Sequence, residues 1–371
     1  MSVPKADPSV LQVVLTLNPG GTERLVLELV KRLAGQSRQA VCCLDEAGTW
    51  GEALRADGTQ VTVLGRQPGF HPSLARRLAA AAREVEADVL HCHQYSPFVY
   101  GALVRVARPG LRLVFTEHGR LSDAPPSPKR RAMNPVLAHA ASHIASVSHD
   151  LKRHMVAEGL PEARIEVVHN GIELGPAPAG DAAAELRRRL ELPSDAFVVG
   201  TVARLDPVKH LQTLVDAAGQ LAQRGRQIHV VVVGDGPERA TLERETQARG
   251  VKHALHFLGH RDDARAFLPG LDVYVNCSIS EGISLTILEA MAASVPVVAT
   301  AVGGTPEIVT DQVGRLVPPR DPLALAAELD TLATQPALRE ALGRAARARV
   351  AEHFTIETMT ERYLRMYRGD A

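Results

Sequence analysis

The hydrophobic residues of this chain form short apolar runs that alternate with amphipathic stretches. The runs are rich in Val, Ile and Leu and are bounded by Gly, Pro, Asp or Ser, a pattern typical of strands that are buried on both faces. In the first half of the chain, strands are predicted at residues 11–17, 40–44, 60–64, 88–93, 112–117, 143–148 and 165–169. In the second half they are predicted at residues 197–203, 228–234, 254–259, 273–277, 296–300 and 314–318.

The stretches between these runs have mostly helical periodicity, as at residues 22–33 and 71–85. Strands that alternate with helices indicate a doubly wound parallel sheet, whose ligand binds at the carboxyl ends of the strands. The Gly-, Pro- and Ala-rich segment 171–185 interrupts the alternation and is predicted to be a linker. We therefore expect an α/β fold with two Rossmann-like domains, at residues 1–174 and 175–352. A C-terminal segment, residues 353–371, should contain a last helix from about residue 355 to 368.

Composition narrows the class of protein. The 371 residues are 45% hydrophobic and 23% charged, as expected for a globular chain of two domains. The formal net charge is zero, which argues against nucleic-acid binding. The first part of the chain has a small basic excess, which permits weak peripheral membrane contact. The polar start of the chain and the absence of a long apolar run predict a cytoplasmic protein, or one at the inner face of the membrane. The four cysteines show no paired spacing and are expected to be buried free thiols.

The most informative stretch is 275–309, which is predicted to form strand, loop, helix and strand before the pair Gly303-Gly304. Glu281 lies in the loop and Glu289 in the helix. A hydrolytic pair of carboxyls stands about 5 to 10 Å apart, whereas eight helical residues rise about 12 Å. This spacing suits the two ends of one elongated polar ligand. The backbone N–H groups of Ser284, Leu285 and Thr286, at the start of the helix, would suit a phosphate.

This stretch resembles the donor-site signature of the retaining, GT-B-fold glycosyltransferases usually called family 4, and the resemblance extends over essentially the whole chain. It implies that Glu281 lies near the donor sugar, that Glu289 holds the nucleotide ribose, and that the backbone of Ser284, Leu285 and Thr286 holds the diphosphate. It also implies that the last helix crosses back onto the first domain. Many relatives have Gly where this chain has Ser284, a change that a backbone-only role tolerates.

Two candidate site segments lie in the first half. The NPGGTER segment joins a strand to a helix, and its Gly20 and Gly21 permit a close backbone approach to an anion. By resemblance they approach the donor phosphates and the acceptor, although a structural tight turn explains them equally well. His118 follows a strand and matches a histidine that the family places beside the donor sugar. A hydrogen-bonded loop histidine is the alternative.

Two other segments have less specific interpretations. His91 and His93 share one face of a strand, but no third metal ligand is evident nearby. We expect His91 to pack in the core and His93 to line a cleft. Residues 121–135 are Pro-rich and include Lys129, Arg130 and Arg131. They are predicted to form a mobile basic loop that contacts an anionic acceptor or lipid surface, or simply a solvated face.

In the second half, Arg204 and Lys209 come from one strand–helix loop, where they could converge on a diphosphate. The resemblance assigns them to neutralising the departing diphosphate, although Ala203 and His210 replace glycines that flank these positions in relatives. Gly234, before a helix expected to begin at Pro237, is expected to line the nucleotide side, and His260 lies where relatives hold the base.

No D-x-D triplet is present, so we expect no metal and no other cofactor. The predicted activity is the retaining transfer of a sugar from a UDP- or GDP-sugar. The acceptor is a glycan, a lipid-linked or a small molecule, and His118, Arg204, Lys209 and Glu281 are the catalytic candidates. The alternatives are a nucleotide-sugar epimerase or hydrolase of the same fold, or a binding protein without chemistry.

Overall fold

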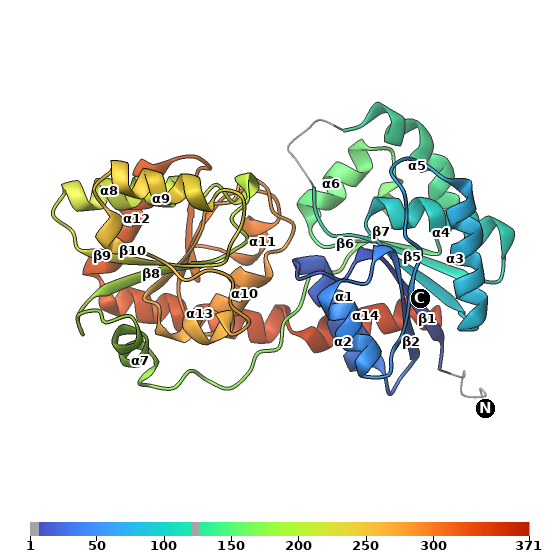
Figure 1. Ribbon diagram of the computed structural model, residues 1–371, viewed down its shortest axis with the longest axis horizontal. Coiled ribbons are helices and arrows are strands. Elements are labelled where there is room, and N and C mark those ends of the chain that lie inside the picture. The colour runs from blue at the N-terminus through green and yellow to red at the C-terminus, as the bar shows by residue number, and fades with distance from the viewer. Residues whose placement is uncertain (1–6, 121–125, 371) are drawn as a thin grey trace. The chain divides into compact units, whose positions relative to one another are not determined.

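The computed structural model describes residues 7–120 and 126–370, which form two compact units. The first unit contains the described residues up to Gly119, those from 126 to Asn170, and those from Ile356 onward. The second unit runs mainly from Gly171 to Thr355. Each unit is an α/β structure built around one parallel sheet (Figure 1).

The sheet of the first unit has seven strands within the described residues, in the order β3-β2-β1-β4-β5-β6-β7, and all neighbouring strands are parallel. Its central strands β1 and β4 are almost entirely buried, which explains their mostly apolar sequences. The strands are β1 (Ser9–Thr16), β2 (Arg38–Glu46), β3 (Gln60–Val63), β4 (Val89–His93), β5 (Arg112–Glu117), β6 (His143–Ser146) and β7 (Ile165–Val167).

Helices cover both faces of this sheet, with α4 and α5 on one side and α1 and α14 on the other (Figure 1). The last helix, α14 (Ile356–Arg368), belongs to this unit and buries Met359, Tyr363 and Tyr367. The other helices are α1 (Gly21–Leu33), α2 (Gly48–Ala56), α3 (Pro72–Glu84), α4 (Tyr95–Ala107), α5 (Pro128–Ala140) and α6 (His149–Ala157), with a 3₁₀ turn η1 (Glu162–Arg164).

The sheet of the second unit has six parallel strands within the described residues, in the order β10-β9-β8-β11-β12-β13. Aliphatic side chains of these strands and of the covering helices make one continuous core, which includes Val199, Val230 and Leu329. The strands are β8 (Phe197–Val202), β9 (Ile228–Val233), β10 (Leu255–Phe257), β11 (Val273–Asn276), β12 (Val297–Thr300) and β13 (Gly314–Val317).

In this unit α8 and α9 lie on one side of the sheet, and α10 and α13 lie on the other (Figure 1). The α-helices are α7 (Ala182–Arg189), α8 (Gln212–Gln223), α9 (Arg239–Ala248), α10 (Leu285–Ala292), α11 (Thr305–Ile308), α12 (Pro322–Thr334) and α13 (Pro336–His353). Short 3₁₀ helices are η2 (Pro207–Lys209), η3 (Lys252–Ala254) and η4 (Ala264–Gly270).

Each sheet has one point where the strand order reverses. It lies between β1 and β4 in the first unit and between β8 and β11 in the second. The loops that follow neighbouring strands diverge at such a point and leave a crevice at the carboxyl ends of the strands, where open α/β sheets bind ligands. The switch points therefore direct attention to the loops after β1 and β4, and after β8 and β11.

Three local predictions from the sequence were wrong. Residues 128–135, expected to belong to a mobile basic loop, are part of helix α5, because Ser127 caps the helix through its hydroxyl and Pro128 occupies the first helical position. Residues 121–125 of that loop lie outside the described residues. Helix α9 begins at Arg239 rather than at Pro237, because Asp235 and Gly236 continue the loop. Finally, α7 occupies the end of the predicted linker.

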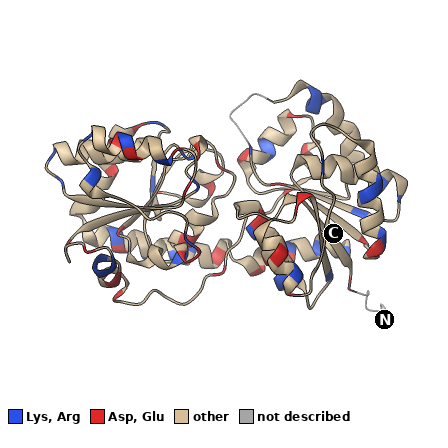
Figure 2. Ribbon diagram, viewed as in Figure 1, with Lys and Arg blue, Asp and Glu red and all other residues tan. Residues whose placement is uncertain are grey.

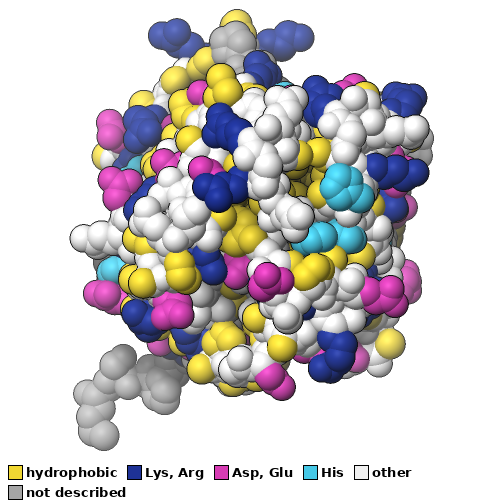
Figure 3. Space-filling model, turned by 90° about the vertical axis from the view of Figure 1, so that its left-hand side faces the viewer, with side chains coloured by type: hydrophobic (Ala, Val, Ile, Leu, Met, Phe, Trp, Pro, Cys, Tyr) yellow, Lys and Arg dark blue, Asp and Glu magenta, His cyan; other side chains and the backbone are white. Residues whose placement is uncertain are grey.

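The surface carries both signs of charge in close mixture. Lys and Arg alternate with Asp and Glu along the helices of each unit (Figure 2), and no extended patch of one sign covers the face drawn in Figure 3. All four cysteines are buried and free, as expected. Within the described residues, no helix has the length and apolar character needed to cross a bilayer.

Candidate functional site

The loops after β8 and β11 bring Lys209 and Glu281 into direct contact. Lys209 ends η2, and its Nζ donates a hydrogen bond to Oε1 of Glu281 at 2.7 Å. The side chain of Glu281 is only 9% exposed and that of Lys209 is 25% exposed. The pair lies at the switch point of the second sheet, where the two loops leave neighbouring strands. Two of the residues predicted to be catalytic thus form one partly buried ion pair.

Further donors converge on the Glu281 carboxylate. Ser278 Oγ donates to Oε1 at 2.6 Å and Asn276 Nδ2 donates to it at 3.2 Å. Burial by itself would raise the pKa of Glu281, but the charge of Lys209 and these hydrogen bonds outweigh it and hold the pKa below its ordinary value. Glu281 is therefore a carboxylate at neutral pH, with a fixed orientation. Such a group can accept a hydrogen bond from a ligand hydroxyl but cannot act as a proton donor.

The backbone fixes both loops. Ile279 N donates to Val208 O at 2.9 Å, which joins the two loops beside the ion pair. Gly303 has a φ of +53°, and a Cβ there would lie 1.9 Å from Glu281 O, so the loop after β12 can support Glu281 only with glycine at this position. Gly234 has the same role for the other loop, because a Cβ there would lie 1.9 Å from Ala203 O. The glycine that was expected to line the nucleotide side supports the loop that carries Lys209.

Arg204 does not join this cluster in the structure. Its side chain is 74% exposed and pairs with Asp206, close by in the same loop. His210, which stands where relatives have glycine, adopts a left-handed conformation with φ 44° and ψ 45°. Its Nδ1 lies 2.8 Å from Thr213 Oγ1, which offsets part of the cost of that conformation. His210 therefore adopts a conformation that glycine reaches more easily.

The N-terminus of α10 follows the Glu281 loop. Ser284 is its N-cap, and its hydroxyl accepts the N–H of Ile287. The Thr286 hydroxyl lies 2.7 Å from the hydroxyl of the buried Tyr274 and 3.2 Å from Ser284 Oγ, so it is engaged within the protein. No carbonyl of α10 can accept the N–H groups of Leu285 and Thr286, because they precede the first intrahelical bond. The hydroxyls at this terminus are structural, and the backbone N–H groups can receive an anion.

Glu289, which by resemblance holds the nucleotide ribose, is not an exposed residue of the helix surface. Its side chain is 9% exposed, and Oε1 lies 3.0 Å from Nε of Arg265 in η4. A carboxylate has about four positions that accept hydrogen bonds. His260 is different, because its side chain is 65% exposed, and its Nε2 lies 3.5 Å from Oδ1 of the exposed Asp262.

In the first unit, the predicted residues lie at the carboxyl ends of the strands. Gly20 caps α1 in an extended conformation, and a Cβ there would approach the Glu23 carboxylate to 2.2 Å. A Cβ at Gly21 would meet nothing within 4 Å, so packing does not require this glycine. His118 directly follows β5, and its Nε2 lies 2.9 Å from Nδ1 of His93 at the end of β4. Burial lowers the pKa of His118 to about 3, so the ring is neutral.

The pair His91 and His93 is fully engaged by protein groups. His91 lies 2.7 Å from the Tyr367 hydroxyl and 2.8 Å from Thr116 Oγ1, and His93 contacts His118 and Gln12. Every ring nitrogen of the pair therefore has a protein partner, as expected for packing and not for metal ligation. His91 is part of the core, as predicted. His93 was expected to line a cleft but is buried, because both of its ring nitrogens contact protein groups.

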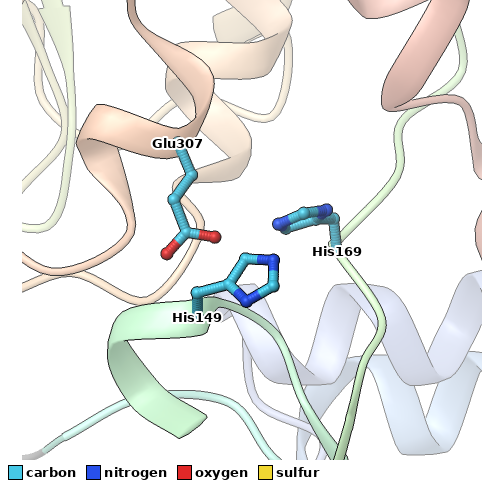
Figure 4. Close-up of side chains that lie close together, drawn as sticks. All are labelled: His149, His169 and Glu307. Atoms are coloured by element: carbon cyan, nitrogen blue, oxygen red, sulfur yellow. The ribbon is translucent and has the colours of Figure 1, made fainter. Parts of the chain in front are cut away.

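A second pair of histidines, His149 and His169, follows β6 and β7. Their ring centroids lie 5.9 Å apart in an edge-on arrangement (Figure 4). Glu307, also drawn there, belongs to α11 of the second unit. These residues were not predicted as site residues, although His149 follows a predicted strand and His169 ends one.

Glu117 was also not predicted to be a site residue. It ends β5 and is buried, and burial raises its pKa to about 7, against the opposing effects of Arg130 and of backbone N–H groups. Arg130, expected to be in a mobile loop, is fixed instead. Its guanidinium lies 3.0 Å from Glu158 and stacks over the ring of Tyr95. The end of β5 thus places a titratable carboxyl beside His118.

Several polar groups near the Lys209–Glu281 pair also escaped prediction. Asn276 and Ser278 come directly after an apolar strand, a signal that was available in the sequence. Ser280 Oγ and Thr305 Oγ1 are buried without a hydrogen-bond partner among the described residues, and this is visible only in three dimensions. The partnership of Arg265 with Glu289 has no sequence signal at all.

Two parallel-sheet α/β units, each with a polar site at its switch point, define the GT-B class of glycosyltransferase folds. The likeness extends to a solved structure, that of Anabaena Alr3699/HepE in complex with UDP. It matches with a TM-score of 0.85 and 23% identity over 97% of this chain and 100% of that chain.

Sequence comparison places the chain within this class. The pattern described as "Glycosyl transferases group 1" matches residues 183–349, and that of "Glycosyltransferase Family 4" matches residues 19–175. The chain belongs to this family of glycosyltransferases. Among curated relatives, a D-inositol 3-phosphate glycosyltransferase of Salinispora arenicola is 34% identical over 76% of this chain and 69% of its own length. The enzyme of the same description from Salinispora tropica is 33% identical over 76% of this chain, and the match spans 64% of its length.

Proposed function

We propose that the protein transfers a sugar from a nucleoside diphosphate donor to an acceptor hydroxyl with retention of anomeric configuration. The observation that carries the proposal is the Lys209–Glu281 ion pair, held at the switch point just before the N-terminus of α10. UDP is the first donor nucleotide to test, because Alr3699/HepE has been solved with UDP and with UDP-glucose.

In this proposal the second unit holds the donor. The diphosphate lies against the ammonium group of Lys209 and the N–H groups of Leu285 and Thr286, which need no metal ion to neutralise it. The exposed side chain of Arg204 can swing from Asp206 to the same phosphates. The ribose hydroxyls bind the carboxylate of Glu289, and the base lies toward His260.

The chemistry is a substitution at the anomeric carbon. The bond from this carbon to the leaving phosphate oxygen breaks, the acceptor oxygen forms the new bond on the same face, and the acceptor proton passes to the departing phosphate. Negative charge grows on the diphosphate as the bond breaks, so Lys209 stabilises the transition state more than the bound donor. Glu281 orients Lys209 and accepts a hydrogen bond from the sugar. The protein thereby contributes positioning and charge rather than acid–base groups.

The first unit supplies the acceptor site in this proposal, with Gly20, Gly21 and His118 on the sugar side. The name of the Salinispora relatives makes D-inositol 3-phosphate the first acceptor to test. Glycans and lipid-linked sugars complete the acceptor panel. No other cofactor is proposed.

A weak membrane contact of the first unit is also proposed. Val106 on α4 and Val136 on α5 are each 74% exposed, and the two helices pack against each other. The positive side chains Lys129 and Arg131 are near the start of α5. Apolar and basic side chains together favour an anionic lipid surface. Sedimentation with vesicles of neutral and of anionic lipid tests this contact. We expect binding to the anionic vesicles, and binding to neither kind of vesicle would contradict the proposal.

The proposed activity is tested by incubating the protein with UDP-glucose, with and without acceptor. Formation of an α-linked product only when acceptor is present supports retaining transfer. Free glucose or an altered nucleotide sugar from donor alone would instead identify a hydrolase or epimerase of this fold. Binding without any turnover of the UDP- and GDP-sugar panel would indicate a binding protein.

A further inference from the structure

A series of hydrogen-bonded side chains extends across neighbouring strands of the first sheet and ends at His118. Nε2 of His118 lies 2.9 Å from Nδ1 of His93, and Nε2 of His93 lies 2.8 Å from Oε1 of Gln12. Gln12 and His93 are fully buried, on β1 and β4. The distances alone do not tell which ring nitrogens carry protons, because each neutral imidazole has two tautomers.

Which group donates and which accepts in each of these hydrogen bonds is determined at the other end of the series, at Ser37. The Ser37 hydroxyl donates its hydrogen to the backbone carbonyl of Leu33 at 3.1 Å, and a carbonyl can only accept. Ser37 Oγ must therefore accept from Nε2 of Gln39, at 2.6 Å. The carbonyl oxygen of Gln39 then faces Nε2 of Gln12 at 2.9 Å, so the amide of Gln12 is a donor on this side. Its oxygen consequently faces His93.

The same order of donors and acceptors continues through the rings of His93 and His118. Gln12 Oε1 can only accept, so His93 carries its proton on Nε2 and presents a lone pair at Nδ1. His118 must donate to that lone pair from its own Nε2. Burial lowers the pKa of both rings, which keeps them neutral. His118 Nδ1 is therefore an unprotonated acceptor, and this buried atom has no hydrogen-bond partner among the described residues.

A second branch leaves Gln12 with the same direction. Its other amide hydrogen reaches the hydroxyl of Tyr367 at 3.2 Å, and Tyr367 donates to Nδ1 of His91 at 2.7 Å. His91 then donates from Nε2 to Thr116 Oγ1 at 2.8 Å. Both hydrogens of the Gln12 amide are thus engaged. Reversing this amide would require Gln39 and the rings of His91, His93 and His118 to reverse with it, and the Ser37 hydroxyl to give up the Leu33 carbonyl.

We propose that Gln12 and His93 are positioning residues that hold His118 as the neutral Nε2–H tautomer, so that its Nδ1 accepts a hydrogen bond from a hydroxyl of the bound sugar. The identity of the hydroxyl-bearing ligand rests on the proposed function, whereas the tautomer does not. An unpartnered buried acceptor is unfavourable, and a ligand hydroxyl that donates to it removes that cost. The same lone pair repels carboxylate and phosphate oxygens, so this position selects the sugar and rejects anionic groups.

The tautomer can be measured directly by ¹⁵N NMR on histidine-labelled protein without ligand. The His118 signals are assigned by their absence from His118→Asn. Protonated and unprotonated ring nitrogens have distinct chemical shifts, and we expect Nε2 protonated and Nδ1 unprotonated at about pH 7. A proton on Nδ1, or a charged ring, overturns the proposal.

Two variants separate the positioning role from general packing. Gln12→Met keeps the length of the side chain but removes the acceptor of the His93 proton, so His118 should show a mixture of both tautomers. Thr116→Val interrupts only the second branch and should leave His118 in the Nε2–H form. An unchanged single tautomer in a folded Gln12→Met protein would remove Gln12 from the positioning role.

The proposed hydrogen bond between His118 Nδ1 and the sugar is tested by a separate measurement. At a UDP-glucose concentration that calorimetry shows to be saturating, the Nδ1 signal should shift toward the protonated value, and saturating UDP should leave it unchanged. His118→Gln, which loses the acceptor at the Nδ1 position, should lower kcat/KM about tenfold. An unchanged Nδ1 signal with bound UDP-glucose overturns the sugar contact. Failure of UDP-glucose to bind contradicts the proposed donor and leaves the tautomer result standing.

Discussion

Lys209 Nζ and Glu281 Oε1 lie 2.7 Å apart although the two residues are 72 positions apart in the sequence. The contact exists because β8 and β11 are neighbours at the switch point of the second sheet, so the loops that follow them leave from adjacent positions. A backbone bond from Ile279 to Val208 and the glycine at 303 then fix both loops. The pair is a product of topology and backbone packing together.

Lys209→Ala should destabilise the protein by about 3 kcal/mol at neutral pH, because it leaves Glu281 buried without its cation. In the wild type the lowered pKa of Glu281 contributes stability above the unfolded pKa, and this contribution is lost as the pH falls through the folded pKa. Without Lys209, burial should raise that pKa, so the variant should regain stability relative to the wild type as the pH falls. Urea unfolding at several pH values measures this. Lys252→Ala, at an exposed lysine, is the control, and an equal loss in both variants would contradict the prediction.

Ser284→Ala should cost about 1 kcal/mol of stability, because the Ser284 hydroxyl caps α10. Ser284→Thr retains a capping hydroxyl and should cost less. Since the diphosphate contacts are assigned to backbone N–H groups, the affinity for UDP should change little in either variant. Thermal unfolding and calorimetry report the two quantities, and a large loss of affinity with unchanged stability would instead give the hydroxyl a ligand contact.

Glu117→Gln should flatten the pH dependence of stability between about pH 4.5 and 8. Because burial raises the pKa of Glu117 to about 7, its contribution is fully present below the unfolded pKa and is lost as the pH rises through about 7. The variant should therefore be more stable than the wild type at about pH 8, by about 3 kcal/mol. Glu166→Gln, at an exposed glutamate, should follow the wild type. If the two variants have the same pH profile, Glu117 ionises normally.

Transfer should not require a divalent metal, because Lys209 and the N-terminus of α10 neutralise the diphosphate in the proposed site. Activity should survive dialysis against EDTA. Loss of activity that manganese or magnesium restores would show that the proposed diphosphate site is wrong.

Much of the fold follows from the sequence for identifiable reasons. Strands such as β9, with four consecutive valines, are buried on both faces and can be recognised from apolar runs alone. Helix α5 was missed because its Pro-rich surroundings suggested a loop, although Ser127 and Pro128 together are a helix-start signal.

Individual residues of the candidate site could be predicted from the sequence, but the contacts between their side chains could not. Lys209 and Glu281 were selected individually, and only the loop geometry shows that they are partners. Arg204 was expected beside Lys209, yet the direction of its side chain depends on Asp206, which the sequence pattern does not decide. The polarity of the His93–His118 chain depends on five successive hydrogen bonds, which no local pattern encodes.

The central claim is that the second unit binds a nucleoside diphosphate through Glu289 and the neighbouring loops, and calorimetric titration with UDP, GDP and ADP tests it most directly. At least one nucleotide should bind the wild type, and Glu289→Ala should weaken that binding by about 1.5 to 3 kcal/mol, the contribution of a hydrogen bond to a charged acceptor. Arg265→Ala controls for the lost ion pair and should weaken binding less, because the carboxylate remains. Binding of the same nucleotide to Glu289→Ala with unchanged affinity, or no binding of any of the three to the wild type, would contradict the account.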